Sequence, residues 1–268
     1  MYKYILFLSV FLFACKKKNT DIPRINLAQQ PSKISVFETD TGSNTEHLNY
    51  FIRYAYDTLN NRFDSINISN AKQYVFDYTQ FAAEKMVVAK YNTVFGNSDR
   101  IYYNPINNTL YKYATQSTPT IDSTLLSFDS LSQIQTIQFA SIVPSQNFSW
   151  SFKYTFDTIF KQMSFNTAAC NTVDTIITTY KKFNNQLPYL LFINYYNSCT
   201  IELPTNLLLA LPTSVNYYKI PTKAWSNNVE TYFTYTADAQ GRLATFTAAT
   251  FRKNDMHLLK KVKFVLEY

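Results

Sequence analysis

Apolar and polar residues alternate along much of this 268-residue chain, and this period of two limits its fold more than any other feature. The clearest runs are residues 152–156, 233–235 and 262–268. Because successive side chains of a strand point to opposite faces, such runs predict strands with an apolar inner face and an outer face of Thr, Lys or Asn. The abundant Thr, Tyr, Phe, Ile and Val suit a pleated, half-buried surface, so we predict an all-β fold.

Asn and Asp, rather than Gly, mark the turns between these runs. The chain has only 3 Gly, whereas turn-like segments with Asn or Asp recur at 57–61, 104–108, 184–185 and 238–241. Both residue types tolerate left-handed backbone angles and bond to their own backbone. Short turns join antiparallel neighbours, which predicts a meander that forms a curved sheet, an open barrel or a sandwich.

Two of the expected hairpins, 54–66 and 232–246, share one order of residues. Each has Tyr, Asp, Arg and then Leu or Phe, as in Tyr235, Asp238, Arg242 and Leu243. This order is similar to hairpins in uncharacterised lipoproteins of Bacteroidota and to the YD-type hairpin of larger repeat proteins. The motif is a turn signature without chemistry of its own. The resemblance therefore implies fold class, compartment and lineage, and it assigns no catalytic residue.

Two segments depart from plain alternation. Residues 81–91 begin with good helix formers but alternate later, and we expect a strand there because their neighbours are strands. In residues 202–212, Thr205 or Asn206 can cap a helix that Pro212 ends. This pattern predicts one short helix near 205–211.

The N-terminus carries Lys3, an apolar run over 4–13, and the ending Leu12-Phe13-Ala14-Cys15. A ten-residue helix spans roughly 15 Å, half of a bilayer core of roughly 30 Å, which is typical of a signal-peptide h-region. The ending resembles the bacterial lipobox, which implies removal of residues 1–14 and lipidation of Cys15. An ordinary cleaved signal peptide is the alternative.

Residues 15–32 are polar and contain two prolines, so we interpret them as a lipidated tether to a single β domain over 33–268. A split into two halves near 114–124 is the alternative. Lipoproteins of Bacteroidota that reach the cell surface often carry acidic residues after the lipidated Cys. Here Lys16, Lys17 and Lys18 follow instead. The resemblance therefore implies an outer-membrane anchor that faces the periplasm.

If Cys15 is lipidated, two cysteines remain, Cys170 and Cys199. An even pair in an exported chain predicts one disulfide, whose loop of about thirty residues is worth roughly 3–4 kcal/mol in the chain-entropy model. Two buried free thiols are the alternative. Neither of the 2 His lies near either Cys in the sequence, so we expect no metal site.

Composition and missing motifs exclude several classes of function. The formal charge is +7, but no long basic stripe appears, so we expect no nucleic-acid partner. The few glycines form no phosphate-binding loop, and neither Gly-x-Ser-x-Gly nor His-Glu-x-x-His occurs. We therefore predict that the chain is not an enzyme and has no cofactor.

The aromatic residues, 22 Tyr, 22 Phe and 2 Trp, are the remaining candidates for binding. Most should pack in the core or across strands. Rings that face solvent could stack on sugars or receive a peptide, and an exposed strip would mark a binding surface. The candidates are Trp150, Tyr195, Tyr196, Tyr217, Tyr218 and Trp225.

Three functions remain open. The first is a non-catalytic, membrane-anchored periplasmic lipoprotein with a binding or structural role and a protein or glycan partner. The second is a glycan-binding accessory lipoprotein of a polysaccharide-uptake system. The third is a lipid or lipoprotein carrier with an apolar cavity in a half-open barrel, and an interior filled by the chain's own side chains would argue against it.

Overall fold

The computed structural model describes residues 26–69, 73–91, 98–103, 110–117, 120–128, 134–140, 148–154, 158–165, 172–180, 219–225 and 228–268. These residues contain sixteen strands. The strands are β1 (Lys33–Thr39), β2 (Glu46–Asp57), β3 (Arg62–Ile68), β4 (Gln73–Asp77), β5 (Met86–Tyr91), β6 (Ser98–Tyr103), β7 (Leu110–Ser117), β8 (Thr120–Phe128), β9 (Ile134–Ala140), β10 (Phe148–Tyr154), β11 (Thr158–Phe165), β12 (Thr172–Tyr180), β13 (Lys219–Trp225), β14 (Val229–Ala237), β15 (Leu243–Arg252) and β16 (Leu258–Glu267).

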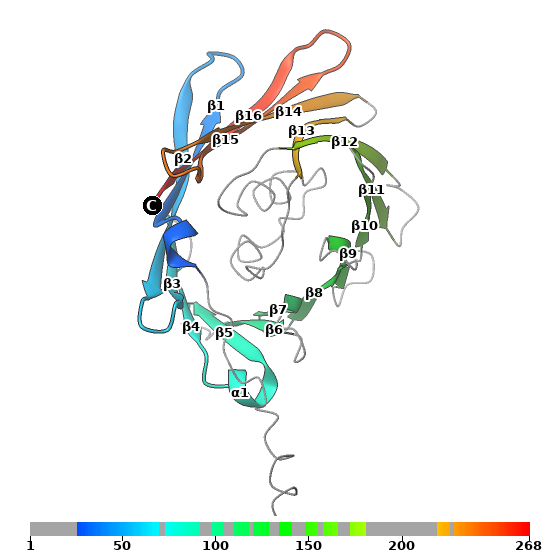
Figure 1. Ribbon diagram of the computed structural model, residues 1–268. Coiled ribbons are helices and arrows are strands. Elements are labelled where there is room, and N and C mark those ends of the chain that lie inside the picture. The colour runs from blue at the N-terminus through cyan, green and yellow to red at the C-terminus, as the bar shows by residue number, and fades with distance from the viewer. Residues whose placement is uncertain are drawn as a thin grey trace, which may run out of the picture.

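Every strand pairs with the strand before it and the strand after it, always antiparallel, and the ribbons follow one another around a ring (Figure 1). The predicted all-β antiparallel meander is confirmed. The first and last strands also pair, from Lys33 opposite Glu267 to Thr39 opposite Lys261. This pair closes the sheet into a barrel and leaves no free edge. The segment proposed as a possible split, 114–124, lies in the hairpin of β7 and β8.

The strand predicted over 81–91 is wrong at its first residues, which form the short helix α1 (Phe81–Glu84). The helix formers after Phe81 prevail here, because one helical turn places the Phe81 ring in a fully buried position. Lys85 then takes a left-handed conformation with φ of 53°, its N–H donates to Phe81 O, and β5 begins at the next residue. A 3₁₀ turn, η2 (Leu27–Gln29), precedes β1. The helix predicted near 205–211 lies outside the described residues.

The barrel wall has one apolar and one polar face. On β16, Val262, Phe264 and Leu266 are at most 7% exposed, whereas the alternate residues include Lys261 and Lys263. The register continues the apolar row onto β15, where Phe246 is opposite Phe264. The ring centroid of Phe246 lies 5.2–5.9 Å from the ring centroids of Phe233, Tyr235 and Phe264.

A second stretch of the same apolar face covers β2 to β6. Its rings pair across strands, with centroids of Phe63 and Phe76 6.0 Å apart and those of Tyr74 and Tyr91 5.1 Å apart. Ile66 and Ile101 on this face are at most 2% exposed. Cross-strand contacts of this kind are the unit from which a sheet gains stability.

The apolar face is the inner face of the barrel. A side chain on the outside of a single-layer barrel has only neighbours on its own face, so a large ring such as Phe246, which is 0% exposed, is assigned to the inside. The opposite, outward row is rich in Ser, Thr and basic residues. The described basic residues of this row are Lys33, Arg53, Lys90, Arg100, Lys112, Lys153, Lys223, Lys261 and Lys263.

Candidate functional site

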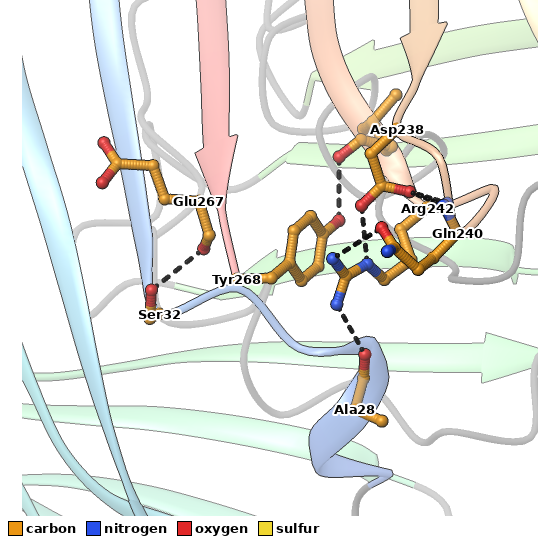
Figure 2. A network of polar contacts seen from close by, with 8 residues as sticks. Ala28, Ser32, Asp238, Gln240, Arg242, Glu267 and Tyr268 are labelled. Carbon is orange, nitrogen blue, oxygen red and sulfur yellow. Dashed lines mark hydrogen bonds and ion pairs between the residues drawn. The ribbon is translucent and has the colours of Figure 1, made fainter.

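The N-terminal segment is fixed to one rim of the barrel by a polar network around Arg242 (Figure 2). The Arg242 guanidinium donates to Asp238 Oδ2 at 2.7 Å and to the carbonyl of Ala28, within η2, at 3.1 Å. It also lies 3.9 Å from the ring centroid of Tyr268. Arg242 therefore joins the β14–β15 turn to the segment that precedes β1 and to the C-terminal residue, Tyr268.

Main-chain bonds secure the same segment from two further strands. The Ser32 N–H donates to Glu267 O at 2.7 Å, and Tyr54 N–H donates to Ser32 O at 2.9 Å. The Tyr56 hydroxyl donates to the carbonyl of Pro31, a buried residue. We call this end of the barrel the N-terminal rim; it comprises residues 26–32, the turns 58–61 and 238–242, and Tyr268.

The hairpin motif found in the sequence builds the same clamp twice. Arg242 pairs with Asp238 and covers Tyr268, whose hydroxyl donates to Leu243 O at 2.8 Å. In the other hairpin Arg62 pairs with Asp57 at 2.9 Å and lies over the ring of Tyr78 at 4.4 Å. The Tyr78 hydroxyl likewise donates to the carbonyl after the arginine, at Phe63. The Asp and Arg of each hairpin, together with the Tyr under the Arg, therefore hold the turn in place, and we call this arrangement a turn clamp.

The described outer wall carries a cluster of three rings and an ion pair on β13, β14 and β15. We call it the ring platform; its residues are Lys223, Trp225, Glu230, Tyr232 and Phe251. The register places Trp225 and Phe251 on either side of Glu230, and Lys223 opposite Tyr232. All five are partly exposed. The rings of Tyr232 and Phe251 meet edge to face at 5.8 Å.

The ion pair organises the ring platform. Lys223 Nζ lies 2.9 Å from Glu230 Oε2, and it stands over the rings of Trp225 at 5.5 Å and Tyr232 at 4.9 Å. The Tyr232 hydroxyl donates to the same carboxylate at 2.8 Å. The hydrogen bond from Lys223 lowers the pKa of Glu230, and the bond to Glu230 raises the pKa of Lys223. Both groups are therefore charged at neutral pH.

Of the residues singled out from the sequence, Trp225 lies in the ring platform. Trp150 lies in β10, where its Cα is opposite Ile137 and Met163. The other predicted site residues lie outside the described part of the chain: Cys15, Cys170, Tyr195, Tyr196, Cys199, Tyr217 and Tyr218. Lys223, Glu230, Tyr232 and Phe251 were not predicted as site residues. The ordinary β alternation around Tyr232 and the turn residues near Phe251 gave no signal of a shared location.

Among the residues whose exposure the structure describes, one carboxylate is buried, that of Asp99 on the inner face, which is 2% exposed. The Tyr91 hydroxyl donates to it at 3.1 Å. Within the described ranges, no group of His, Cys, Asp and Glu has the arrangement of a metal site. The same ranges hold no helix with the length and hydropathy needed to cross a bilayer.

No protein-family model matches the chain, and no curated protein matches it in sequence. Among solved structures, a porin-like protein from Bacteroides uniformis superposes with a TM-score of 0.58 at 12% identity, over 89% of this chain and 97% of that one. A porin-like protein from Bacteroides vulgatus gives a TM-score of 0.46 at 9% identity, over 87% and 97%. The first likeness shows that this fold recurs in a Bacteroides protein.

Proposed function

We propose that this chain is a non-catalytic barrel of the cell envelope with a binding or structural role. The barrel lies in the aqueous phase, and a lipidated N-terminal segment anchors it to the membrane. One observation carries the proposal: the described wall is mostly apolar on its inner face, whereas its outer face carries many basic residues. A barrel embedded in lipid has the reverse arrangement, an apolar band facing outward. A single outward Lys or Arg at the bilayer midplane costs about 2–4 kcal/mol, and the outward basic residues named above lie on eight of the sixteen described strands.

The tether explains how such a barrel stays at a membrane. The lipobox-like ending at Cys15 supplies the anchor, and residues 16–25 link it to the N-terminal rim. Ten residues span at most about 35 Å, so the N-terminal rim is the end held near the membrane. The basic residues after Cys15 favour the periplasmic side of the outer membrane, as the resemblance to lipoproteins of Bacteroidota implies.

The other functions inferred from the sequence gain unequal support. A lipid carrier needs open apolar space, whereas inner rings such as Phe233, Phe246 and Phe264 are buried. A hydrolase that works with two carboxylates gains no support either, since Asp99 is the one buried carboxylate among the residues whose exposure the structure describes, and a tyrosine bonds to it. A glycan-binding accessory protein is the second candidate, because the ring platform offers rings and polar groups together on an outer surface.

Mass spectrometry of the mature N-terminus tests the anchor. We expect a protein that begins at a diacylated Cys15 and fractionates with membranes until detergent is added. Cys15→Ala should abolish the lipid mass, whereas the matched change Cys170→Ser should leave it intact. A mature chain that begins at another residue, or membrane association that persists in Cys15→Ala and resists alkaline extraction, would contradict the proposal.

A further inference from the structure

We propose that the ring platform is a binding site for an acidic glycan, a sugar polymer that carries carboxylates. The inference rests on the proposed binding role and names its ligand class. Three partly exposed rings, those of Trp225, Tyr232 and Phe251, come from three adjacent strands and lie on the charged outer wall. Their position is not required for the core, because the inner positions of these strands hold other residues, such as Phe233 and Ala248. Flat rings held on a rigid sheet can stack against the apolar face of a sugar ring.

The ring platform lies near the rim opposite the N-terminal rim. Strand β13 ends at Trp225, and β14 begins at Val229. The turn that follows β15 lies beside it, since Lys253 N–H donates to Asn228 O at 3.0 Å. A protein held to a membrane by its N-terminal rim therefore presents this site away from the bilayer, where polymers outside the membrane reach it.

Hydroxyl groups extend the site along the same outward rows. Thr234 is opposite Thr247, and Thr236 is opposite Thr245 with hydroxyl oxygens 2.7 Å apart. Sugar hydroxyls can both donate to and accept from such groups. The outer positions of β13 and β15 are two strand spacings apart, about 10 Å, so an extended chain rather than a single sugar would contact rings at both ends.

Charge selects an acidic ligand over a neutral one. Glu230 is the acid of the ring platform, and it is already engaged by Lys223 and Tyr232. The charge of Lys253 also acts on Glu230, and Lys261 is opposite Ala249, the residue paired with Tyr232. Cations thus exceed acids around the rings, and a ligand carboxylate can share the Lys223 ammonium. An attraction of this kind weakens as salt screens it.

Titration calorimetry with polygalacturonate tests the proposal on the full-length lipidated protein in detergent micelles, with uncharged dextran as the control polymer. We expect binding to polygalacturonate that weakens as salt rises, and none to dextran. Trp225→Ala should weaken binding at least tenfold. Phe37→Ala is the matched control, because Phe37 is an outward ring under a lysine on β1, with Lys263 Nζ 5.7 Å from its centroid, and its loss should leave binding unchanged.

Three results would overturn the inference. Absence of polygalacturonate binding, or binding that Trp225→Ala leaves intact, would remove the site, and equal binding of dextran would remove the acidic ligand class. Lys223→Gln gives an independent check, since it keeps the rings but should reduce binding and its salt dependence together. The N-terminal mass is measured on the same sample. A lipidated protein that binds no glycan would overturn this inference alone, and an unlipidated protein that binds it would overturn the anchor alone.

Discussion

Truncation of Phe246 tests whether the inner face is the core of a barrel that is stable in water. The ring is fully buried among Phe233, Tyr235 and Phe264, with centroids 5.2–5.9 Å away. A buried Phe removes about 150–200 Å² from water, which at about 25 cal/mol per Å² gives roughly 4–5 kcal/mol. Large-to-small changes of this type cost about 3–5 kcal/mol in measured proteins. We therefore expect Phe246→Ala to lower the free energy of unfolding by about 3–5 kcal/mol.

The control is the next residue along the chain. Thr247 lies on the outward row, opposite Thr234 and Lys263, so Thr247→Ala should change the free energy of unfolding by less than about 0.5 kcal/mol. Urea unfolding, followed by circular dichroism without detergent on protein made without residues 1–15, measures both. A loss below about 1 kcal/mol for Phe246→Ala, or an equal loss for Thr247→Ala, would refute the assignment of the two faces.

Three further outcomes follow from the described contacts and from the sequence. Tyr268→Phe removes a hydroxyl bond from the turn clamp, and urea unfolding should show a loss of about 0.5–1.5 kcal/mol; no loss would deny the clamp a role. The hydrogen bond from Lys90 lowers the pKa of Asp77 in the folded protein. The ionised Asp77 therefore contributes to stability above the pKa of an aspartate in the unfolded chain, about 3.9, and this contribution is lost as pH falls. The urea midpoint should therefore drop less between pH 5 and pH 3 in Asp77→Asn than in the wild type, and equal drops would contradict this. Alkylation of the unfolded protein in denaturant, without reductant, should leave Cys170 and Cys199 unmodified if they form the predicted disulfide, whereas two labelled thiols would exclude it.

The strands were predictable because the polarity of each residue indicates which face of the sheet it lies on. Alternation assigned Phe233 and Tyr235 to one face and Val262 and Phe264 to one face, and the register joins these rows into the inner apolar surface. Closure of the barrel was not predictable in the same way. It depends on the pairing of the first and last strands, and no short segment records a contact over that separation. The strand prediction for the α1 residues was wrong for another reason, because local helix propensity outweighed the strand context.

The candidate site was predictable only in part. Trp225 was a candidate because an aromatic ring can stack on a ligand, but its partners reach it through cross-strand register on β13, β14 and β15. Likewise, the sequence shows the Asp and Arg of each hairpin clamp within one turn. Tyr78 and Tyr268 complete the two clamps from the ends of other strands, and only the folded barrel brings them there.

The central claim is that the barrel, with its apolar inner face and charged outer face, lies in the aqueous phase and not in the bilayer. Proteolytic release of the barrel from its tether tests this claim most directly. A site for a specific protease, inserted after Lys18 in the full-length lipidated protein, permits one cut in washed membranes without detergent. We predict that cleavage moves the barrel into the supernatant after ultracentrifugation, with its β-sheet circular dichroism retained. A cleaved barrel that stays in the membrane pellet and needs detergent for extraction would contradict the account.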